Sequence, residues 1–402
     1  VGSLTDGGDV QGGTIANSGV GAAILTLGSG NSNSAFSGVI QNGSGAIILF
    51  KAGTGTLALS GANTYSGGTE VDAGVLQAGI DTVGSHGAIT SSAIGTGALT
   101  LDDGTLQLGG SYTIANDIGL GTHSGTIDAN GYYVTLSGNI TGSTGIVFTD
   151  TAATRSFTNL SGNNTYSGTT TNASGVVHHS SATALSAISD YVVSDTGAAG
   201  GAGRLDMNGF SGTMLSLAGN TGGQVYNDGP DATLTIAPAS GSATFAGTIK
   251  DSGAGQALAL VMNGAAGSKE ILSGANTYVG GTTISGGILG VGSNTALGTG
   301  TVTLDGGALE TEGDFTLANA LAVNSTGGTI DANGQALFLA GGIGNGINGN
   351  AGTLTFTDTS GNGIVVLQGT SSYGGAVVID SGVGVAADGA NTLPGGAYTV
   401  NG

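Results

Sequence analysis

Three acidic residues have a spacing that suits carboxylate chemistry. Glu310, Glu312 and Asp314 alternate by two along the chain, so on a strand all three share one face, about 7 Å apart. Such a set could form the acid and base pair of a glycosidase, or bind Ca²⁺ through its oxygens. The corresponding strand of an earlier repeat, residues 106–110, carries no acid, and no basic or aromatic sugar platform accompanies the three residues. We therefore expect a solvated acidic face and keep these residues only as weak metal candidates.

Other groups that could support catalysis are few and dispersed. The chain has four histidines, His86, His123, His178 and His179, and none lies in an H-E-x-x-H zinc pattern. Neighbouring residues on a strand point to opposite faces, so His178 and His179 would not grip one ion, and we expect them in a solvated loop. The pairs Asp102 with Asp103 and Asp228 with Asp231 are further carboxylate candidates. The chain contains no cysteine and no G-x-S-x-G motif, which leaves acyl transfer without a nucleophile. We predict no enzyme activity and no catalytic residue.

One segment resembles a nucleotide-binding loop by pattern alone. Residues 344–349 satisfy G-x-G-x-x-G, but a dinucleotide site also needs a helix that begins in the loop. No helix pattern follows, and glycine is so frequent that chance matches are expected. We predict a turn-rich loop there and no cofactor.

The charge balance restricts the partners. With 25 acidic and 5 basic residues the net charge is −20, so nucleic acid, anionic membranes and polyuronates would be repelled. The longest apolar runs are far shorter than the roughly 18 residues of a membrane span, which predicts no direct membrane span. The chain begins at Val1 without a signal-like segment, and we interpret it as a fragment.

The elements that would position these residues are strands. Glycine supplies 84 of 402 residues, and Gly, Thr, Ser, Val and Asn dominate where a helix would need other residues. Short runs such as residues 56–60 and 353–356 alternate apolar with small polar residues, as half-buried strands do. Asn-Gly and Asp-Gly pairs between them mark tight turns. The sequence predicts an all-β protein.

Internal repeats define the organisation. The string Leu-Ser-Gly-Ala-Asn-Thr-Tyr at residues 59–65 returns at residues 272–278 and, with Asn in place of Ala, at residues 160–166. A degenerate copy lies near residue 373. A second motif, Ile-Asp-Ala-Asn-Gly at residues 127–131, returns at residues 330–334. We predict two cycles, 1–209 and 210–402, in one continuous domain. The residues expected to be structural in these motifs are Asn63, Tyr65, Gly67, Tyr166, Asn276, Tyr278, Tyr373, Asp128, Asn130, Gly131, Asp331, Asn333 and Gly334.

Tandem short strands could form a propeller or a solenoid. Propeller blades need bulky aromatic packing, and only 5% of the chain is aromatic, with no Trp. Solenoid turns instead stack small, similar side chains along an axis. We therefore predict a parallel β-solenoid, with about 18 turns of 20 to 25 residues each. The tyrosines of the repeat are expected to anchor turns, with exposed sugar-stacking rings as the alternative.

The first repeat block, residues 59–79, resembles the passenger-associated repeat of bacterial autotransporters, and residues 284–292 match its second half. This resemblance implies a right-handed parallel β-helix. It also implies export to the cell surface through a Gram-negative-type outer membrane.

The predicted function is that of a non-enzymatic extracellular passenger or stalk that mediates adhesion or self-association. Its expected partners are other surface proteins, host or abiotic surfaces, or copies of itself. A structural segment of a self-assembling extracellular fibre is the main alternative, because strand edges at solenoid ends favour stacking. A polysaccharide-binding or polysaccharide-cleaving β-helix is the minor one.

Overall fold

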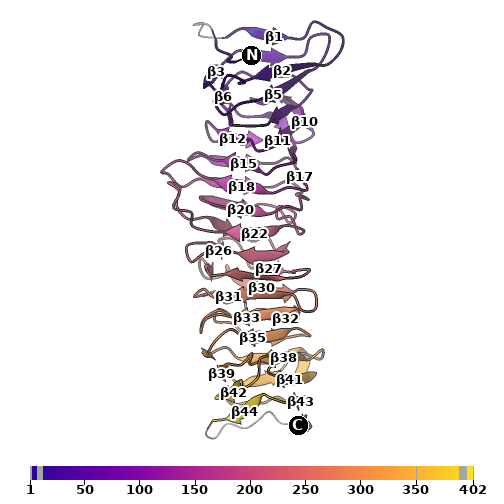
Figure 1. Cartoon of the computed structure of the whole chain (residues 1–402), viewed down its shortest axis with the longest axis vertical. Coiled ribbons are helices and arrows are strands. Elements are labelled where there is room, and N and C mark those ends of the chain that lie inside the picture. The colour runs from indigo at the N-terminus through magenta and orange to yellow at the C-terminus, as the bar shows by residue number, and fades with distance from the viewer. Residues whose placement is uncertain (1, 7–11, 350, 389–395, 402) are drawn as a thin grey trace. The chain divides into compact units, whose positions relative to one another are not determined.

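The computed structural model describes residues 2–6, 12–349, 351–388 and 396–401. These residues form strands and one short 3-10 helix, η1 (Ile347–Gly349), with no α-helix among them. The chain divides into two compact units, Val1–Leu205 and Asp206–Gly402. Within each unit, strands stack turn upon turn into a parallel β-solenoid (Figure 1), and the chain holds about 17 turns in all. The predicted fold class is confirmed. The single continuous domain stays a prediction.

The first unit has three long parallel faces and two short pairs. One face runs in the order β17 (Ile140–Gly142), β14 (Ile118–Leu120), β11 (Leu99–Leu101), β7 (Thr69–Val71), β5 (Ile47–Lys51) and β2 (Ala23–Leu27). The second runs β22 (Asp190–Val193), β20 (Thr170–Asn172), β18 (Ile146–Thr149), β15 (Gly125–Asp128), β12 (Thr105–Leu108), β8 (Val75–Ala78), β6 (Thr56–Leu59) and β3 (Ser34–Phe36). The third runs β13 (Thr113–Ile114), β16 (Tyr133–Leu136), β19 (Phe157–Leu160) and β21 (Val176–His179). The pairs are β1 (Thr14–Ala16) with β4 (Val39–Gln41), and β9 (Val83–Ser85) with β10 (Ala88–Ser91).

The second unit repeats this plan. One face runs β24 (Gly212–Met214), β27 (Ala232–Ile236), β30 (Leu258–Asn263), β32 (Thr282–Gly286), β34 (Val302–Leu304), β37 (Leu321–Val323) and β40 (Ile343–Asn345). Another runs β28 (Ser242–Phe245), β31 (Lys269–Leu272), β33 (Ile288–Val291), β35 (Ala308–Thr311), β38 (Gly328–Asp331), β41 (Thr353–Thr357), β43 (Ala376–Ile379) and β45 (Tyr398–Val400). The shorter sets are β36 (Phe315–Leu317), β39 (Ala336–Leu339), β42 (Ile364–Leu367) and β44 (Gly384–Ala387), and β26 (Gln224–Asn227) with β29 (Thr248–Asp251). Strand β25 (Ser216–Ala218) also lies in this unit, and β23 (Arg204–Asp206) contains the boundary between the units.

The core of each unit is a set of apolar columns along successive turns. In the first unit the parallel register places Leu57 beside Leu76, Leu76 beside Leu106, Leu106 beside Ile127 and Ile127 beside Phe148. All five side chains are buried. Each such burial contributes about 1.5 to 3 kcal/mol, so the columns favour the solenoid on every turn.

One hairpin departs from the parallel plan. Strands β9 and β10 pair antiparallel, within a corner that is short in the other repeats. Equivalent asparagines of the three blocks bond to carbonyls 30, 20 and 20 residues later, so the first block carries 30 − 20 = 10 additional residues. The hairpin is this insertion.

Candidate functional site

The repeat block buries its tyrosine and ties it to a threonine. Tyr65, Tyr166 and Tyr278 are buried, so these rings are not exposed for sugar stacking, and their role in anchoring turns stays a prediction. The hydroxyl of each lies within hydrogen-bond distance of the threonine hydroxyl four residues later, in the pairs Tyr65 with Thr69 (2.6 Å), Tyr166 with Thr170 (2.7 Å) and Tyr278 with Thr282 (2.7 Å). The predicted motif residues do not include these threonines, although their constant spacing from the tyrosines is visible in the sequence. Tyr373, in the degenerate fourth copy of the repeat, is also buried, but its hydroxyl donates to the Gly352 carbonyl at 2.6 Å.

Burial also changes the acidity of these phenols. Desolvation raises the pKa of Tyr65 and of Tyr278, and the threonine hydrogen bond offsets only part of that rise. In the second block, burial and the neighbouring Tyr191 both raise the pKa of Tyr166. These hydroxyls are therefore structural donors and acceptors rather than acids.

The asparagine of the block connects three successive turns. The side-chain oxygen of Asn63 accepts the Ile40 backbone N–H of the preceding turn at 2.7 Å, and its amide donates to the Ala93 carbonyl of the following turn at 2.7 Å. Asn276 makes the same two contacts, with Ile249 at 2.7 Å and Ala296 at 2.6 Å. Asn164 repeats them with Ile140 and Ala184, at 2.8 and 2.7 Å. It is an equivalent residue that the predicted motif set, with Asn63 and Asn276, does not include.

The glycines of the block allow close approach of neighbouring turns. A Cβ on Gly61 would lie 1.8 Å from the Gly38 carbonyl oxygen, and one on Gly274 would lie 1.7 Å from that of Gly247. At Gly67 a Cβ would lie 2.4 Å from the Ile47 oxygen. Only glycine fits such contacts, which accounts for part of the unusual glycine content.

The second motif is a turn tied to its neighbour. Asp128 accepts the Asn130 N–H at 2.9 Å, and Asn130 adopts a left-handed φ of 50°. The Gly131 N–H then donates to Asp150 of the next turn at 2.8 Å, while Thr151 returns a bond to Asp128 at 3.1 Å.

The second unit contains the same ladder. Asn333 donates to Asp331, Gly334 to Asp358 and Thr359 back to Asp331, at 2.9, 2.6 and 3.1 Å. At these corners, hydrogen bonds from backbone N–H groups to carboxylate side chains thus take the place of backbone pairing between strands. The motif residues Asp128, Asn130, Gly131, Asp331, Asn333 and Gly334 all have structural contacts here.

The acidic triplet is not an open acidic face. Lys269 lies 2.5 Å from Glu310 and also contacts Glu312, and the side chains of Lys269 and Glu310 are only 19% and 9% exposed. Desolvation lowers the pKa of Lys269, but the hydrogen bonds and charges of the two glutamates outweigh it and raise that pKa. Asp314 is exposed and accepts the Ala336 N–H at 2.8 Å. The expected solvated face was wrong for Glu310, since sequence spacing cannot show that a lysine two turns away neutralises it.

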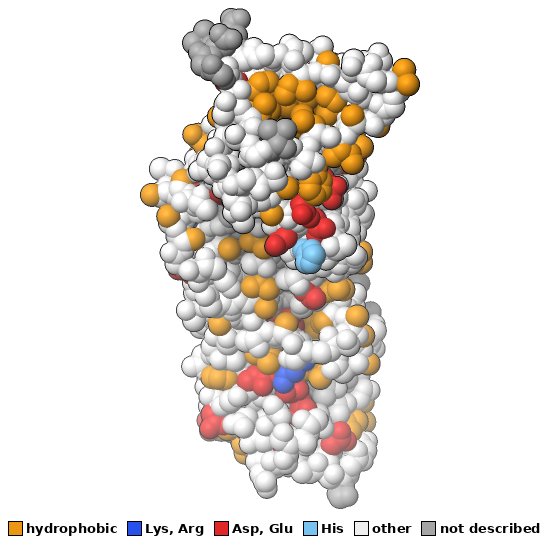
Figure 2. All heavy atoms as spheres, turned by 45° about the horizontal axis from the view of Figure 1, so that its top comes forward, with side chains coloured by type: hydrophobic (Ala, Val, Ile, Leu, Met, Phe, Trp, Pro, Cys, Tyr) orange, Lys and Arg blue, Asp and Glu red, His pale blue; other side chains and the backbone are white. Residues whose placement is uncertain are grey.

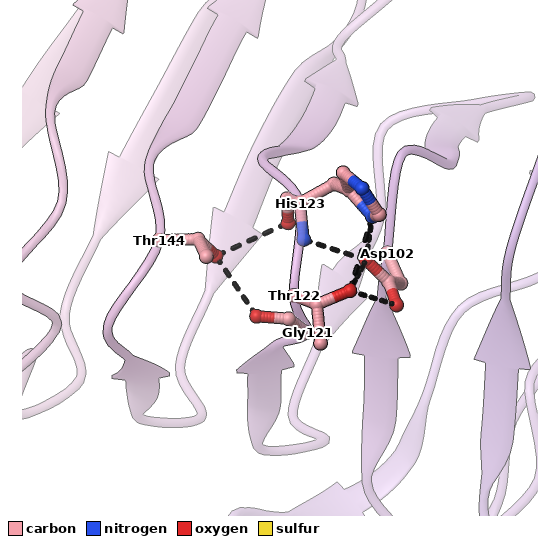
Figure 3. A network of polar contacts seen from close by, with 5 residues as sticks. All are labelled: Asp102, Gly121, Thr122, His123 and Thr144. Carbon is pink, nitrogen blue, oxygen red and sulfur yellow. Dashed lines mark hydrogen bonds and ion pairs between the residues drawn. The ribbon is translucent and has the colours of Figure 1, made fainter.

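Asp102, Thr122 and His123 form the exposed polar network of Figure 3. His123 Nδ1 lies 2.8 Å from Asp102 and 3.1 Å from the Thr122 hydroxyl, which itself lies 3.0 Å from Asp102. Desolvation raises the pKa of Asp102, but hydrogen bonds from His123 and Thr122 lower it overall. In a hydrolase relay the hydroxyl and the carboxylate contact opposite ring nitrogens. Here both contact Nδ1, so the network holds the turn in place rather than activating Thr122.

The remaining histidines do not converge. His86, at the tip of the inserted hairpin, lies 2.7 Å from Asp117. His178 and His179 belong to β21, with His179 buried, so the predicted solvated loop was wrong. Their alternating orientation on a strand agrees with the expectation that they do not grip one ion. Across the ranges that the structure describes, no three His, Asp or Glu side chains form a metal-binding group.

Two further sequence features have structural explanations. Lys51 is buried, with its ammonium donating to the carbonyls of Ala52, Gly53 and Ala73 at 2.9, 2.8 and 3.0 Å; burial lowers its pKa. The glycine pattern at residues 344–349 begins within β40 and contains the three-residue η1, which is too short to provide the helix of a dinucleotide site. Within the described part of the chain, no helix is long and apolar enough to cross a membrane.

The chain is a parallel β-solenoid built from tandem repeats, and comparison with known proteins identifies the class of repeat. The model of the passenger-associated-transport-repeat matches residues 49–78, 158–177, 269–291 and 359–383, which include the four repeat tyrosines. The chain is 32% identical over 399 residues to the adhesin BmaC autotransporter of Brucella suis biovar 1 (strain 1330). That match covers 89% of this chain and 10% of the relative. No solved structure matches the chain.

The passenger-associated repeats and the curated relative support an autotransporter passenger domain. The matched repeats and the relative indicate a surface-exposed protein that is exported across the outer membrane.

Proposed function

We propose that this chain is a non-enzymatic adhesive segment. Its outward strand faces, which carry few charged side chains, make contact with other cells, matrix or abiotic material. The observation that carries the proposal is the 32% identity to an adhesin autotransporter over most of this chain. The chain spans 10% of that relative, so the contact made by the whole protein is part of the proposal.

The surface chemistry supports this role. On the face shown in Figure 2, charged side chains are sparse and uncharged atoms cover most of the surface. Outward strand positions carry residues such as Thr283 and Thr303, which are neighbours in register on β32 and β34. Repeated small contacts of this kind are individually weak but add up when many engage together.

The polar clusters support a non-enzymatic role. Glu310 is paired with Lys269, and a carboxylate held by an ammonium is a poor general acid. The His123 network lacks the geometry of a relay, as described above. Polysaccharide turnover by the purified chain that Glu310→Gln or Glu312→Gln abolished would contradict this part of the proposal.

Bead adhesion tests the adhesive role. Microspheres coated with the folded chain are expected to bind to cultured cells, matrix-coated glass or plain glass more strongly than microspheres coated with the same chain after unfolding. Equal binding of both preparations to every surface would contradict the proposal. If coated beads instead clump only with one another, the fibre alternative replaces adhesion to foreign surfaces.

A further inference from the structure

Three successive turns of the first unit place aromatic rings on one outer face. The Tyr133 and Phe157 rings stack at 4.9 Å between centroids with 11° between planes. Phe157 in turn meets the His178 ring edge-on, at 5.1 Å and 90°. The three residues lie on β16, β19 and β21, which are adjacent parallel strands. We call Tyr133, Phe157, His178 and the polar residues between them the aromatic face.

The first ring of this face is open on one side. Thr113 pairs with Thr135, so Ser111 lies opposite Tyr133 on the preceding turn, and the Tyr133 N–H donates to the Ser111 hydroxyl at 3.1 Å. A serine side chain is too short to cover a phenol ring. Tyr133 is 60% exposed, whereas a ring that served only to pack turns together would be covered on both faces.

Polar groups accompany the rings. Thr135 and Asn159 are register neighbours, with the Asn159 amide 3.4 Å from the Thr135 hydroxyl, and Asn159 is in turn the neighbour of His178. The strands read Tyr-Val-Thr-Leu, Phe-Thr-Asn-Leu and Val-Val-His-His, without Asp, Glu, Lys or Arg. An exposed ring beside a hydroxyl and an amide matches a ligand with both a C–H face and hydroxyl groups.

We infer that the aromatic face binds a neutral glycan, with one sugar ring stacked on the open side of Tyr133 and its hydroxyls on Thr135 and Asn159. The C–H bonds of a sugar carry the positive polarisation that the face of an aromatic ring attracts. A nucleobase could stack in the same way, but its phosphates would meet a chain of net charge −20, and sialylated or sulfated glycans meet the same repulsion. The inference rests on the proposed adhesive function and names its ligand class.

Immobilised neutral oligosaccharides of hexose and N-acetylhexosamine type, with sialylated and sulfated counterparts, provide the probes. The whole chain is expected to bind at least one neutral probe and to bind the acidic counterparts more weakly. Tyr133→Ala is expected to weaken binding at least tenfold and Tyr133→Phe to retain it. Phe210→Ala, at another partly exposed aromatic residue, is expected to leave it unchanged.

A second variant separates binding from folding. Ser111→Tyr adds a ring on the open side of Tyr133, so it continues the stack and occupies the position of the sugar. It is expected to abolish glycan binding while the unfolding midpoint stays the same or rises. Failure of the chain to bind any neutral probe, or full binding by both Tyr133→Ala and Ser111→Tyr, overturns the inference.

The bead assay distinguishes this inference from the proposed function. Coated beads that adhere as well with Tyr133→Ala as with the original chain, in the absence of neutral-glycan binding, overturn the glycan site and leave the adhesive role intact. Glycan binding that depends on Tyr133, without bead adhesion, overturns the adhesive role alone.

Discussion

At the scale of single residues, the repeat block stabilises corners rather than forming a reactive centre. Asn63 links three turns through one amide, and Tyr65 fills the interior beside it while its hydroxyl meets Thr69. At a corner the backbone N–H and C=O groups are not all paired between strands, and an asparagine in this position supplies hydrogen bonds to them. The same chemistry recurs at Asn276 and Tyr278 in the second unit.

Alkaline stability tests the buried phenols. The pKa of Tyr278 is raised in the folded chain, whereas in the unfolded chain a tyrosine titrates near about 10. The stabilising contribution is therefore fully present below about pH 10 and is lost as the pH rises toward the folded value, by about 1.4 kcal/mol per pH unit. Tyr278→Phe should cost about 1 kcal/mol at neutral pH but lose less stability above pH 10, so that the two curves converge. Guanidinium unfolding between pH 7 and 11.5 measures this.

A matched control removes a similar amount of stability without a titrating group. Ile249→Val, in the buried core of the same unit, should cost about 1 kcal/mol and give a curve parallel to that of the original chain. Parallel curves for Tyr278→Phe as well would show that this phenol does not limit alkaline stability.

The sequence contains enough information to predict the fold and the positions of the repeat tyrosines, but not the ion pairs. Repeats of Asn, Tyr and Gly mark corners because their conformational needs are local. The contact between Lys269 and Glu310 joins residues 41 positions apart, and the stack of Tyr133 on Phe157 depends on turn length. Such contacts depend on the register between strands of different turns. An insertion of 10 residues, as in the first block, shifts that register without changing any local sequence pattern.

At the scale of elements, Lys269 bridges three strands of one face. Lys269 lies on β31 and Glu310 on β35, with β33 between them. Gly290 of β33 leaves the space for this contact, because a Cβ there would lie 2.7 Å from Glu312 Oε1 and 3.2 Å from Lys269 Cε. Because Gly290 has no side chain, the Lys269 side chain can pass over the middle strand and pair with Glu310.

Breaking this bridge should destabilise the second unit. Lys269→Met leaves the carboxylate of Glu310 buried beside no cation, and the cost should be about 2 kcal/mol, below the 3 to 5 of a fully buried pair, since Lys269 is 19% exposed. Adding Glu310→Gln to Lys269→Met should recover most of the loss, as measured by denaturant unfolding of the four chains of the cycle. Additive losses in the double variant would mean that the two side chains do not interact.

The contact between Lys269 and the two glutamates also predicts the effect of replacing Gly290. Gly290→Ala should cost about 1 to 3 kcal/mol, because the side chains of Glu312, Ile271 and Lys269 must move. Gly21→Ala is the matched control, since a Cβ there meets nothing within 4 Å. Equal unfolding midpoints for both alanine variants would contradict the account of Gly290 as the gap that admits the bridge.

At the scale of the whole molecule, stability should be the sum of many contacts between neighbouring turns. A solenoid turn mainly contacts its neighbours. The core columns and asparagine links described here join adjacent turns, and the Lys269–Glu310 pair within the second unit is an exception. The two units, Val1–Leu205 and Asp206–Gly402, should therefore respond separately to damage.

Hydrogen exchange measures that independence. Tyr65→Ala removes a fully buried ring from the first unit, at a cost of about 3 to 5 kcal/mol, and should accelerate amide exchange in β4, β6, β7 and β11 while residues 206–402 exchange as before. Tyr278→Ala should do the reverse, with faster exchange in β29, β31, β32 and β34 and an unchanged first unit. Mass-spectrometric exchange on the intact chain reads both regions in one experiment. Faster exchange throughout the chain in either variant would mean that the whole molecule unfolds as one cooperative unit, and the sum over neighbouring turns would no longer describe its stability.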